Sequence, residues 1–353
     1  MMFETKLKIQ RKLANWKLKR KRDSVTQQVL DKSLATVLTK YFAKLILLTF
    51  FAMIIMIPFI YMILLSSMSN TQADAVKQGQ SSIWPQEWHI AKNLASAANG
   101  SGESFFPPFN NPEALAKWLE NFPQTYLFSF ILTLANVLLS IVLKVFVTML
   151  LGYGFSLKKW RGKEIIWWFL MMLLVLPEVA LLSGQQWVVF KLNNIPRPAD
   201  KFSEFTYNLF IIAVPFVASI FNGLMYRNAF ESIPNRIKEV AMIDGAVGAK
   251  YLFKIAIPMV QPTTLTIVIL TTLASWNSYL WPSLIAGTNY RVMSVWLFDV
   301  GKDHSSTTAD DRVFYNIKMA GAILVILPMF AFFLVARRKI MNAISRQGST
   351  IKG

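Results

Sequence analysis

The chain has 353 residues, 54% of them hydrophobic and 16% charged, and its mean hydropathy is +0.41. Because soluble domains carry about 25% charged residues, this composition excludes an ordinary soluble domain and a disordered chain. The excess of 37 Lys and Arg residues over 19 Asp and Glu residues fits either nucleic-acid binding or the basic cytoplasmic loops of a membrane protein. The chain has no cysteine and only two histidines, which disfavours disulfides, thiolate catalysis and metal sites.

Residues 1–44 form a basic N-terminal arm that includes Lys17, Lys19 and Arg20 near apolar Leu13 and Trp16. A basic segment next to a membrane span is attracted to anionic lipid by about 1 kcal/mol per charge. We therefore expect the arm to lie on membrane lipid, with a docking or regulatory role as the alternative.

Six apolar segments then follow that are long enough to cross a bilayer, which requires about 20 apolar residues per helix. The first is too long for a signal-peptide core and has no A-x-A cleavage site after it, so we expect it to remain as an anchor. The pattern predicts an all-α polytopic membrane protein with six transmembrane helices, at about 45–65, 126–151, 165–182, 207–226, 263–284 and 319–336.

The distribution of basic residues predicts the orientation. Of the 37 Lys and Arg residues, 26 lie in the arm, in two alternate connections and in the tail 337–353, whereas 10 lie in the other three connections. Cytoplasmic loops carry the excess of basic residues, so both termini should be cytoplasmic. The positive charge is then explained by topology, and we expect no nucleic-acid partner.

Two of the external connections are long. The connection 66–125 has more residues than a hairpin needs, with Gly and Pro punctuation and a helical stretch at about 112–119. The connection 285–318 contains a polar run from Asp303 to Asp311. Either could contact a partner.

The cytoplasmic connection 227–262 differs from the other loops because its apolar residues recur at helical spacing. We expect a first helix after Pro234, a turn at Gly245, and a second short amphipathic helix that ends at Pro258. Such a projecting knob needs an apolar groove to bury Ala241 and Ala246, which predicts a cytoplasmic protein partner. Packing against itself on the lipid surface is the alternative.

This segment also carries a resemblance. The run Glu239-Val-Ala241-Met-Ile-Asp244-Gly245-Ala246, followed by Ile255-Ala-Ile-Pro258 and Pro262, resembles the EAA motif of permease subunits of binding-protein-dependent ABC importers. Val240, Leu252 and Ile257 depart from the usual residues, but the acidic position and the turn glycine remain.

Three further segments resemble the carbohydrate branch of this family, the MalG type of the maltose transporter. They are Ala274–Pro282, Leu176–Val179 and the Gly-rich tail Gly348–Gly353. The resemblance covers about residues 45–353 and leaves out the arm.

The resemblance implies the type I (MetI-like) permease fold in a bacterial cytoplasmic membrane. It implies four kinds of partner: a second, MalF-like permease subunit, two ATP-binding subunits, an external solute-binding protein and membrane lipid. The chain has no G-x-x-x-x-G-K-[ST] loop, so ATP and Mg would be bound by the partner ATPases. We expect a transport subunit for a carbohydrate, without catalytic residues or a cofactor of its own.

Two groups of site residues are expected, the first from the resemblance and the second from polar and aromatic residues inside apolar spans. Coupling to the ATPase is expected from Glu239, Ala241, Asp244, Gly245, Ala246, Ile255 and Pro258. Glu239 would dock in the ATPase cleft, and Asp244 could cap the following helix through its side chain. The translocation path is expected to include Trp276, Asn277, Tyr279, Trp281 and Glu178.

The path residues are expected on a continuous fifth helix, with Trp276 and Tyr279 on one face and Asn277 and Trp281 on a neighbouring face. Packing against the second permease is the alternative role, because polar and aromatic groups in a membrane usually face the bundle. Glu178 could gate the path or lie at the membrane surface. Lys144, inside the second span, is expected to reach the headgroups, with a buried ion pair as the alternative.

Three other functions remain open on the sequence. A permease of the same superfamily could carry glycerol phosphate or another non-sugar solute. A secondary transporter would need paired charges or an inverted repeat, and neither is evident. A membrane-tethered nucleic-acid binder would depend on the arm.

Overall fold

The computed structural model describes residues 12–16, 34–99, 111–115, 122–157, 160–196, 200–285, 290–303 and 312–349. The chain divides into two compact units, Met1–Tyr61 and Met62–Gly353. Most of the basic arm, much of the external connection after residue 99 and the last four residues lie outside the described residues.

The first unit contains most of helix α2 (Leu34–Ser66). Its stretch Leu38–Ser66 is long and apolar enough to cross a membrane, and the side chains from 38 to 61 are exposed. A helix that is apolar on all sides needs an apolar medium around it. This confirms an apolar helix where the first span was predicted.

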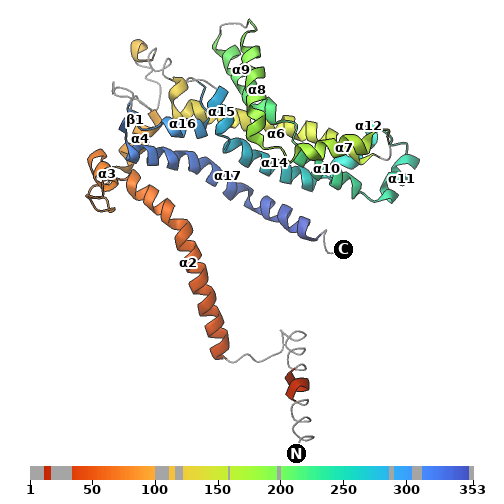
Figure 1. The fold of residues 1–353 in the computed structure, drawn as a ribbon, viewed down its shortest axis with the longest axis horizontal. Coiled ribbons are helices and arrows are strands. Elements are labelled where there is room, and N and C mark those ends of the chain that lie inside the picture. The colour runs from red at the N-terminus through yellow and green to blue at the C-terminus, as the bar shows by residue number, and fades with distance from the viewer. Residues whose placement is uncertain are drawn as a thin grey trace, which may run out of the picture. The chain divides into compact units, whose positions relative to one another are not determined.

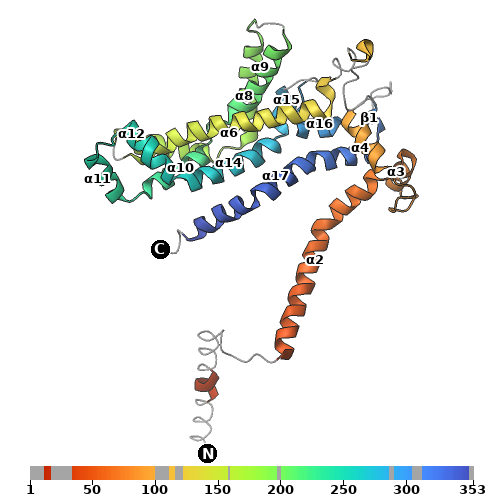
Figure 2. The same ribbon diagram turned by 180° about the vertical axis from the view of Figure 1, so that it is seen from behind.

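The second unit is built on three helices that lie side by side, α6 (Tyr126–Ser156), α10 (Ile220–Glu231) and α14 (Gln261–Trp276) (Figures 1 and 2). Two glycines allow α6 and α10 to approach closely. A Cβ on Gly152 would lie 2.4 Å from the Cβ of Tyr226, and a Cβ on Gly223 would lie 2.6 Å from a Leu151 methyl group. The core beside this contact contains Tyr226, Phe230, Leu252, Ala256 and Ile267.

Helix α17 (Tyr315–Ser349) runs beside α4 (Ile90–Asn99), α14 and α16 (Met293–Asp299). Trp296, Ala320 and Ala97 form the core between them. Helix α3 (Asn70–Lys77) packs against the start of α17. The first part of the long external connection is therefore an ordered part of the fold.

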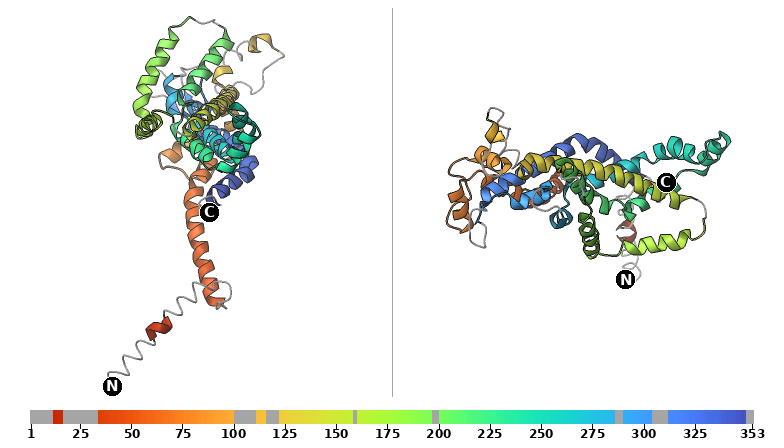
Figure 3. Two further views of the ribbon diagram at one scale, coloured as in Figure 1. Left: turned by 90° about the vertical axis from the view of Figure 1, so that its right-hand side faces the viewer. Right: turned by 90° about the horizontal axis from the view of Figure 1, so that it is seen from above.

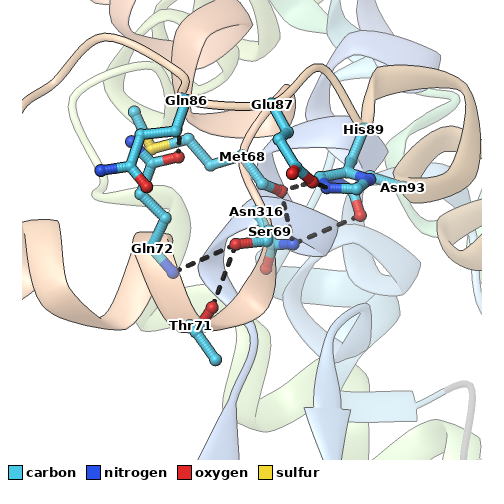
Figure 4. Close-up of polar contacts among 9 residues, drawn as sticks. All are labelled: Met68, Ser69, Thr71, Gln72, Gln86, Glu87, His89, Asn93 and Asn316. Atoms are coloured by element: carbon cyan, nitrogen blue, oxygen red, sulfur yellow. Dashed lines mark hydrogen bonds and ion pairs between the residues drawn. The ribbon is translucent and has the colours of Figure 1, made fainter.

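Buried amides fasten this connection to α17. Asn316 donates its Nδ2 to the carbonyl of Met68 at 3.2 Å, to Asn70 Oδ1 at 2.7 Å and to Asn93 Oδ1 at 3.3 Å (Figure 4). Asn93 in turn donates to the carbonyls of Ser66 and Met68, both at 2.8 Å. A buried backbone carbonyl that lacks a hydrogen-bond donor destabilises the fold, so these amide side chains stabilise the non-helical segment between α2 and α3.

The remaining elements complete the unit. Helices α8 (Glu178–Asn193) and α9 (Lys201–Ala213) form a pair that projects sideways from the α6 bundle (Figure 1). Strands β1 (Lys302–Asp303) and β2 (Arg312–Val313), of two residues each, pair antiparallel and add a short ribbon to an otherwise helical fold. The other elements are η1 (Phe122–Gln124), α7 (Lys163–Leu173), η2 (Val214–Phe216), α11 (Asn235–Ile243), α12 (Ala249–Tyr251), η3 (Leu252–Ala256), α13 (Ile257–Met259) and α15 (Leu280–Ile285).

Three helices among the described residues are long and apolar enough to cross a membrane, and two bent pairs raise the number to as many as five. The three helices are Leu38–Ser66, Tyr126–Ser156 and Tyr315–Arg338. The bent pairs are Lys201–Phe216 with Ile220–Glu231, at 61°, and Ala249–Met259 with Gln261–Trp276, at 71°. The first, second and sixth predicted spans are thus continuous helices.

The third, fourth and fifth predicted spans are broken. The third stops at Leu173 and restarts at Glu178, after Pro177. The fourth breaks at η2, which contains Pro215, and the fifth stops at Trp276 before α15. Proline removes a backbone donor and disfavours helical conformation in the residue before it, which explains the first two breaks.

Candidate functional site

The predicted cytoplasmic knob consists of α11, a glycine turn, and the helical stretch α12–η3–α13. It lies at the opposite end of the second unit from α3 and α4 (Figures 1 and 3). Gly245 has φ +65°, the left-handed conformation that a turn at this point requires. The expectation of a glycine turn here is confirmed.

The turn is a Schellman motif. Ala246 donates its N–H to the carbonyl of Ala241 at 2.8 Å, and Gly245 donates to Met242 at 3.1 Å. In this motif the residue after the glycine packs against the residue five positions before it. Ala241 and Ala246 are that pair, and both are buried. The spacing Ala-x-x-x-Gly-Ala is therefore explained by helix termination.

This packing corrects one expectation. Ala241 and Ala246 were predicted to need a partner's groove, but the chain buries both of them itself. The side chains left exposed are others on the knob, including Ile243, which is 84% exposed. The exposed knob surface comprises Glu239, Val240, Met242, Ile243 and Val247.

Asp244 does not cap the second helix, contrary to the sequence interpretation. It is the C-cap residue of α11, and its N–H donates to the carbonyl of Val240 at 3.0 Å. Gly248, with φ +58°, is the N-cap residue of α12 and makes no side-chain cap. The turn between the two helices therefore has two glycines with positive φ, Gly245 and Gly248, and α12 has no side-chain N-cap.

The second half of the knob remains helical further than predicted. A π-helical turn, Leu252–Ala256, follows α12, and Pro258 lies in the first turn of α13 instead of ending the helix. Because α13 follows the π-helical turn without a break, Pro258 lies inside a continuous helical stretch, and a π-turn is one way in which a helix accommodates an interruption of its i→i−4 hydrogen bonds. The sharp bend comes at Val260, just before α14.

Hollows lie on two sides of α11. One of about 300 Å³ is lined by Lys238, Glu239, Met242 and Tyr251, together with the end of α6. The other, of about 310 Å³, is lined by Arg236, Val240, Asp244 and Ile255. Burial raises the pKa of Tyr251, and the nearby Tyr153 raises it further. The knob thus presents two exposed acids, Glu239 and Asp244, and exposed apolar groups beside two hollows.

A third hollow of about 330 Å³ lies among the membrane helices. One wall is a polar row on α6, formed by Asn136, Ser140 and Lys144, which are four residues apart and share a helix face. The other walls are lined by Val179, Leu182, Ile212, Ala213, Phe216, Ala274, Ser275, Ser278, Tyr279, Leu280 and Trp281.

The predicted path residues divide between this cavity and other places. Tyr279 and Trp281 line it. Trp276 is buried instead beside Val137 and Met293, and the exposed Asn277 donates its Nδ2 to the carbonyl of Leu273 at 2.9 Å. Glu178 begins α8, but its side chain lies outside the described residues. The predicted continuous faces are wrong because α14 ends at Trp276.

All three helix breaks border the cavity. Val179 follows the first break, Phe216 lies in the second, and Ser278 lies in the third. Irregular backbone at membrane depth is tolerated only where protein buries it or where it lines a water-filled cavity. The breaks that interrupt three of the predicted spans therefore all lie at the wall of this cavity.

Sequence analysis missed Asn136, Ser140, Ser275 and Ser278. The available signal was the i, i+4, i+8 spacing of Asn136, Ser140 and Lys144 within an apolar span. Lys144 lines the cavity together with Asn136 and Ser140, and its reach to the headgroups stays a prediction.

Comparison with known proteins identifies relatives of the whole arrangement. Residues 148–300 match the family described as "Binding-protein-dependent transport system inner membrane component". The probable ABC transporter permease protein MG189 homolog of Mycoplasma pneumoniae is 47% identical over 222 residues, which are 61% of this chain and 67% of that protein.

More distant relatives carry substrate names. The probable starch degradation products transport system permease AmyC of Thermoanaerobacterium thermosulfurigenes is 29% identical, over 44% of this chain and 56% of that protein. The sn-glycerol-3-phosphate permease UgpE of Yersinia enterocolitica is 28% identical, over 55% of this chain and 64% of that protein.

The fold is similar to that in a crystal structure of a bacterial ABC transporter involved in the import of the acidic polysaccharide alginate. The TM-score is 0.57 at 19% identity, and the match covers 88% of this chain and 99% of that one. With its apolar helices and its 47% identical relative, the chain belongs to the multi-pass membrane permeases of binding-protein-dependent ABC transporters.

Proposed function

We propose that this permease is the transport subunit of an ATP-driven importer and that it transmits the state of cytoplasmic ATPases to a solute path through the knob. The observation that carries the proposal is the exposed knob surface at the end of the unit opposite the ordered external connection. A compact element with exposed apolar side chains beside an acid fits a groove in a partner protein.

The coupling residues have separate parts in this proposal. Gly245, Ala241, Ala246 and Asp244 hold the turn, while exposed Glu239 and Ile243 contact the ATPase. Ile255 lines one of the two hollows beside α11. Pro258 lies where the knob meets the bend into α14. A rigid contact of this kind can carry free energy from the ATPase to the membrane helices, provided that it has two arrangements.

The membrane part is proposed to have six spans with both termini in the bacterial cytoplasm. Support comes from the excess of basic residues in alternate connections and from the helix breaks that border one cavity. The chain has no cysteine, so single cysteines at the exposed positions Gln78 and Arg338 can be probed with an impermeant maleimide. Labelling from outside and inside, respectively, is expected; reversed labelling contradicts the orientation.

We propose a carbohydrate as the solute, which the name of the AmyC relative supports. Tyr279, which is exposed and lines the cavity, offers an aromatic face for a sugar ring. Glycerol phosphate is the second candidate, because the UgpE relative is similar to this chain to nearly the same degree and Lys144 places a basic side chain in the lining.

The proposed partners are a second, distinct permease subunit, two ATP-binding subunits that bind ATP and Mg, and an external solute-binding protein. The basic arm, residues 1–44, is proposed to rest on anionic lipid. Removing residues 1–30 should then leave transport intact while Lys32, Lys40 and Lys44 remain.

Co-purification tests the proposal most simply. The tagged chain, expressed from its native genome and extracted in mild detergent, should bring down an ATP-binding subunit and a second permease, identified by mass spectrometry. Solutes that stimulate ATP hydrolysis by this complex with its binding protein would then identify the substrate. A chain that purifies alone, monodisperse and folded, contradicts the proposal.

A further inference from the structure

Two threonines of α6 flank the polar row of Asn136, Ser140 and Lys144. Near the two ends, Thr133 and Thr148 are satisfied within the protein: Thr133 donates to the carbonyl of Ser129 at 2.7 Å and accepts the N–H of Met293 at 2.8 Å, and Thr148 donates to the carbonyl of Lys144 at 2.6 Å. Between them, Asn136 and Ser140 line the cavity. Helix packing explains the two threonines but not Asn136 and Ser140.

Asn136 has a buried hydrogen-bond acceptor without a donor. Its side chain is 3% exposed, and its Oδ1 has no hydrogen-bond partner within the described part of the chain. Leaving a buried acceptor unpaired costs about 1–3 kcal/mol. Ser129 Oγ and Thr271 Oγ1 are also unpartnered there, but neither residue lines the cavity. Of the seven buried side-chain atoms without a hydrogen-bond partner in the described part of the chain, Asn136 Oδ1 is the one that belongs to a residue lining this cavity.

The chemistry of the lining limits what that donor can be. A carbonyl oxygen accepts hydrogen bonds only, so a phosphate or carboxylate oxygen cannot satisfy it, whereas a hydroxyl group can. Ser140, Ser275 and Ser278 add hydroxyl groups that both donate and accept. No acidic side chain is among the described lining residues, so the wall does not favour a cation.

The opposite wall is aromatic and fixed in position. Trp281 is buried, its Nε1 donates to the carbonyl of Ile211 at 3.0 Å, and its ring meets that of Phe216 edge to face at 5.9 Å. Tyr279 lies beside it and is exposed. The cavity volume of about 330 Å³ is at the lower end of ligand pockets, about 300–1,000 Å³. It suits a small solute or one end of a chain.

We infer that Asn136 and Ser140 form a subsite that hydrogen-bonds the hydroxyl groups of a polyhydroxylated solute as it passes between the polar row and the aromatic wall. The inference rests on the proposed function and deepens it, because it places solute contact on the second span of this subunit. The shared ligand chemistry is a hydroxyl donor, which a neutral saccharide and glycerol phosphate both carry.

Cysteine accessibility tests the subsite directly in the purified complex. Ser140→Cys is exposed to a charged methanethiosulfonate reagent, with maltotriose or glycerol 3-phosphate as protecting probe. Leu138→Cys is the matched control, since Leu138 is on the same helix and is exposed on the outside of the unit. Ser140→Cys should label many-fold faster than Leu138→Cys, and a hydroxyl-bearing probe should slow it several-fold.

The outcomes separate the possibilities. Protection by maltotriose assigns a neutral saccharide, and protection by glycerol 3-phosphate alone assigns a phosphorylated polyol; both support the subsite. No labelling of Ser140→Cys, or labelling that neither probe slows, overturns it.

Transport kinetics give a second measurement. With the solute that stimulates the complex, Asn136→Leu should raise the KM for uptake about tenfold, which corresponds to one hydrogen bond of about 1.4 kcal/mol. Asn136→Gln, which keeps an amide carbonyl, should recover part of the loss, and Leu138→Ala should behave as wild type. If the complex is stimulated by solute but Asn136→Leu leaves KM unchanged, the subsite fails while the proposed function stands. If no ATPase co-purifies, the proposed function itself fails.

Discussion

At the end of the second unit that contains α3 and α4, buried amides bond to backbone carbonyls from distant parts of the chain, whereas at the knob end apolar side chains remain exposed. Gln72 illustrates the first end: it donates to the carbonyl of Trp84 at 2.8 Å and accepts the N–H of Gln86 at 3.1 Å. Ile243, almost fully exposed, illustrates the second. The first end is held together by hydrogen bonds within the chain, whereas the knob leaves apolar side chains that the chain itself does not cover.

The largest loss of stability should come from the close contact that anchors the knob end to the bundle. In Gly152→Ala the new methyl group would lie 2.4 Å from Tyr226 Cβ and 2.8 Å from the backbone N of Arg227. Forcing α6 and α10 apart should cost about 3 kcal/mol. Gly154→Ala is the control, because nothing lies within 4 Å of its Cβ. Thermal unfolding in detergent measures both, and equal melting temperatures would contradict the packing.

A smaller loss is expected at the external end. Asn93→Ala removes two hydrogen bonds of 2.8 Å and leaves the carbonyl of Ser66 without its side-chain donor, while the carbonyl of Met68 keeps Asn316 alone; this should cost about 1–3 kcal/mol. The same unfolding measurement checks it, with exposed Gln78→Ala as control. If Asn93→Ala matched that control, the amides would not be what stabilises this end.

At the knob the stability of the isolated chain should hardly change. Ile243 is 84% exposed, so Ile243→Asp should alter the free energy of unfolding by no more than about 0.5 kcal/mol. Retention of the ATPase on the tagged chain should nevertheless fall, because a charge then enters an apolar contact. Full retention would show that this face of α11 does not meet the partner.

The smallest effect concerns Tyr290, in the external connection. Its hydroxyl donates to Glu204 Oε2 at 2.9 Å. Burial, followed by the hydrogen bond and charge of Glu204, raises the pKa of Tyr290 from 10.0 to about 12. Because the folded state holds this proton more tightly, the contribution to stability is complete below about pH 10 and is lost as the pH rises toward 12.

Comparison with Tyr290→Phe isolates this contribution. The difference in melting temperature between wild type and Tyr290→Phe should be constant up to about pH 9 and should shrink between the unfolded pKa of 10.0 and the folded pKa of about 12. A difference that grows with pH would mean that Glu204 does not accept this proton.

Local patterns predicted part of this fold. A long apolar run identifies α6 and α17, and Gly245 was expected in a turn, which its φ of +65° confirms. The burial of Ala241 and Ala246 was assigned to a partner, because the glycine was recognised as a turn but not as a Schellman motif, in which these two alanines pack against each other.

Non-local features escaped prediction. An apolar run such as 263–284 has the same composition whether or not its helix is interrupted, so the break after Trp276 was not visible. The amide cluster joins Asn93 to Asn316, which are 223 residues apart. Such a contact depends on the assembled fold. The cavity likewise depends on the packing of three interrupted helices against one another, which a local sequence pattern does not reveal.

In the proposed mechanism, the knob transmits the ATPase state to the membrane helices. Gly245 has φ +65° and open space around its Cβ position, so Gly245→Val should strain the turn by about 1–2 kcal/mol through its backbone alone. Glu239→Lys reverses the charge of an exposed acid. Gly184→Ala, in α8 and also in open space, is the control.

The most direct test measures subunit retention, solute-stimulated ATP hydrolysis and uptake on the same reconstituted preparations of these three variants. Gly245→Val and Glu239→Lys should insert normally yet lose stimulated hydrolysis and uptake together, with weaker ATPase retention for Glu239→Lys, while Gly184→Ala should match wild type. Wild-type coupling in both knob variants would contradict the account.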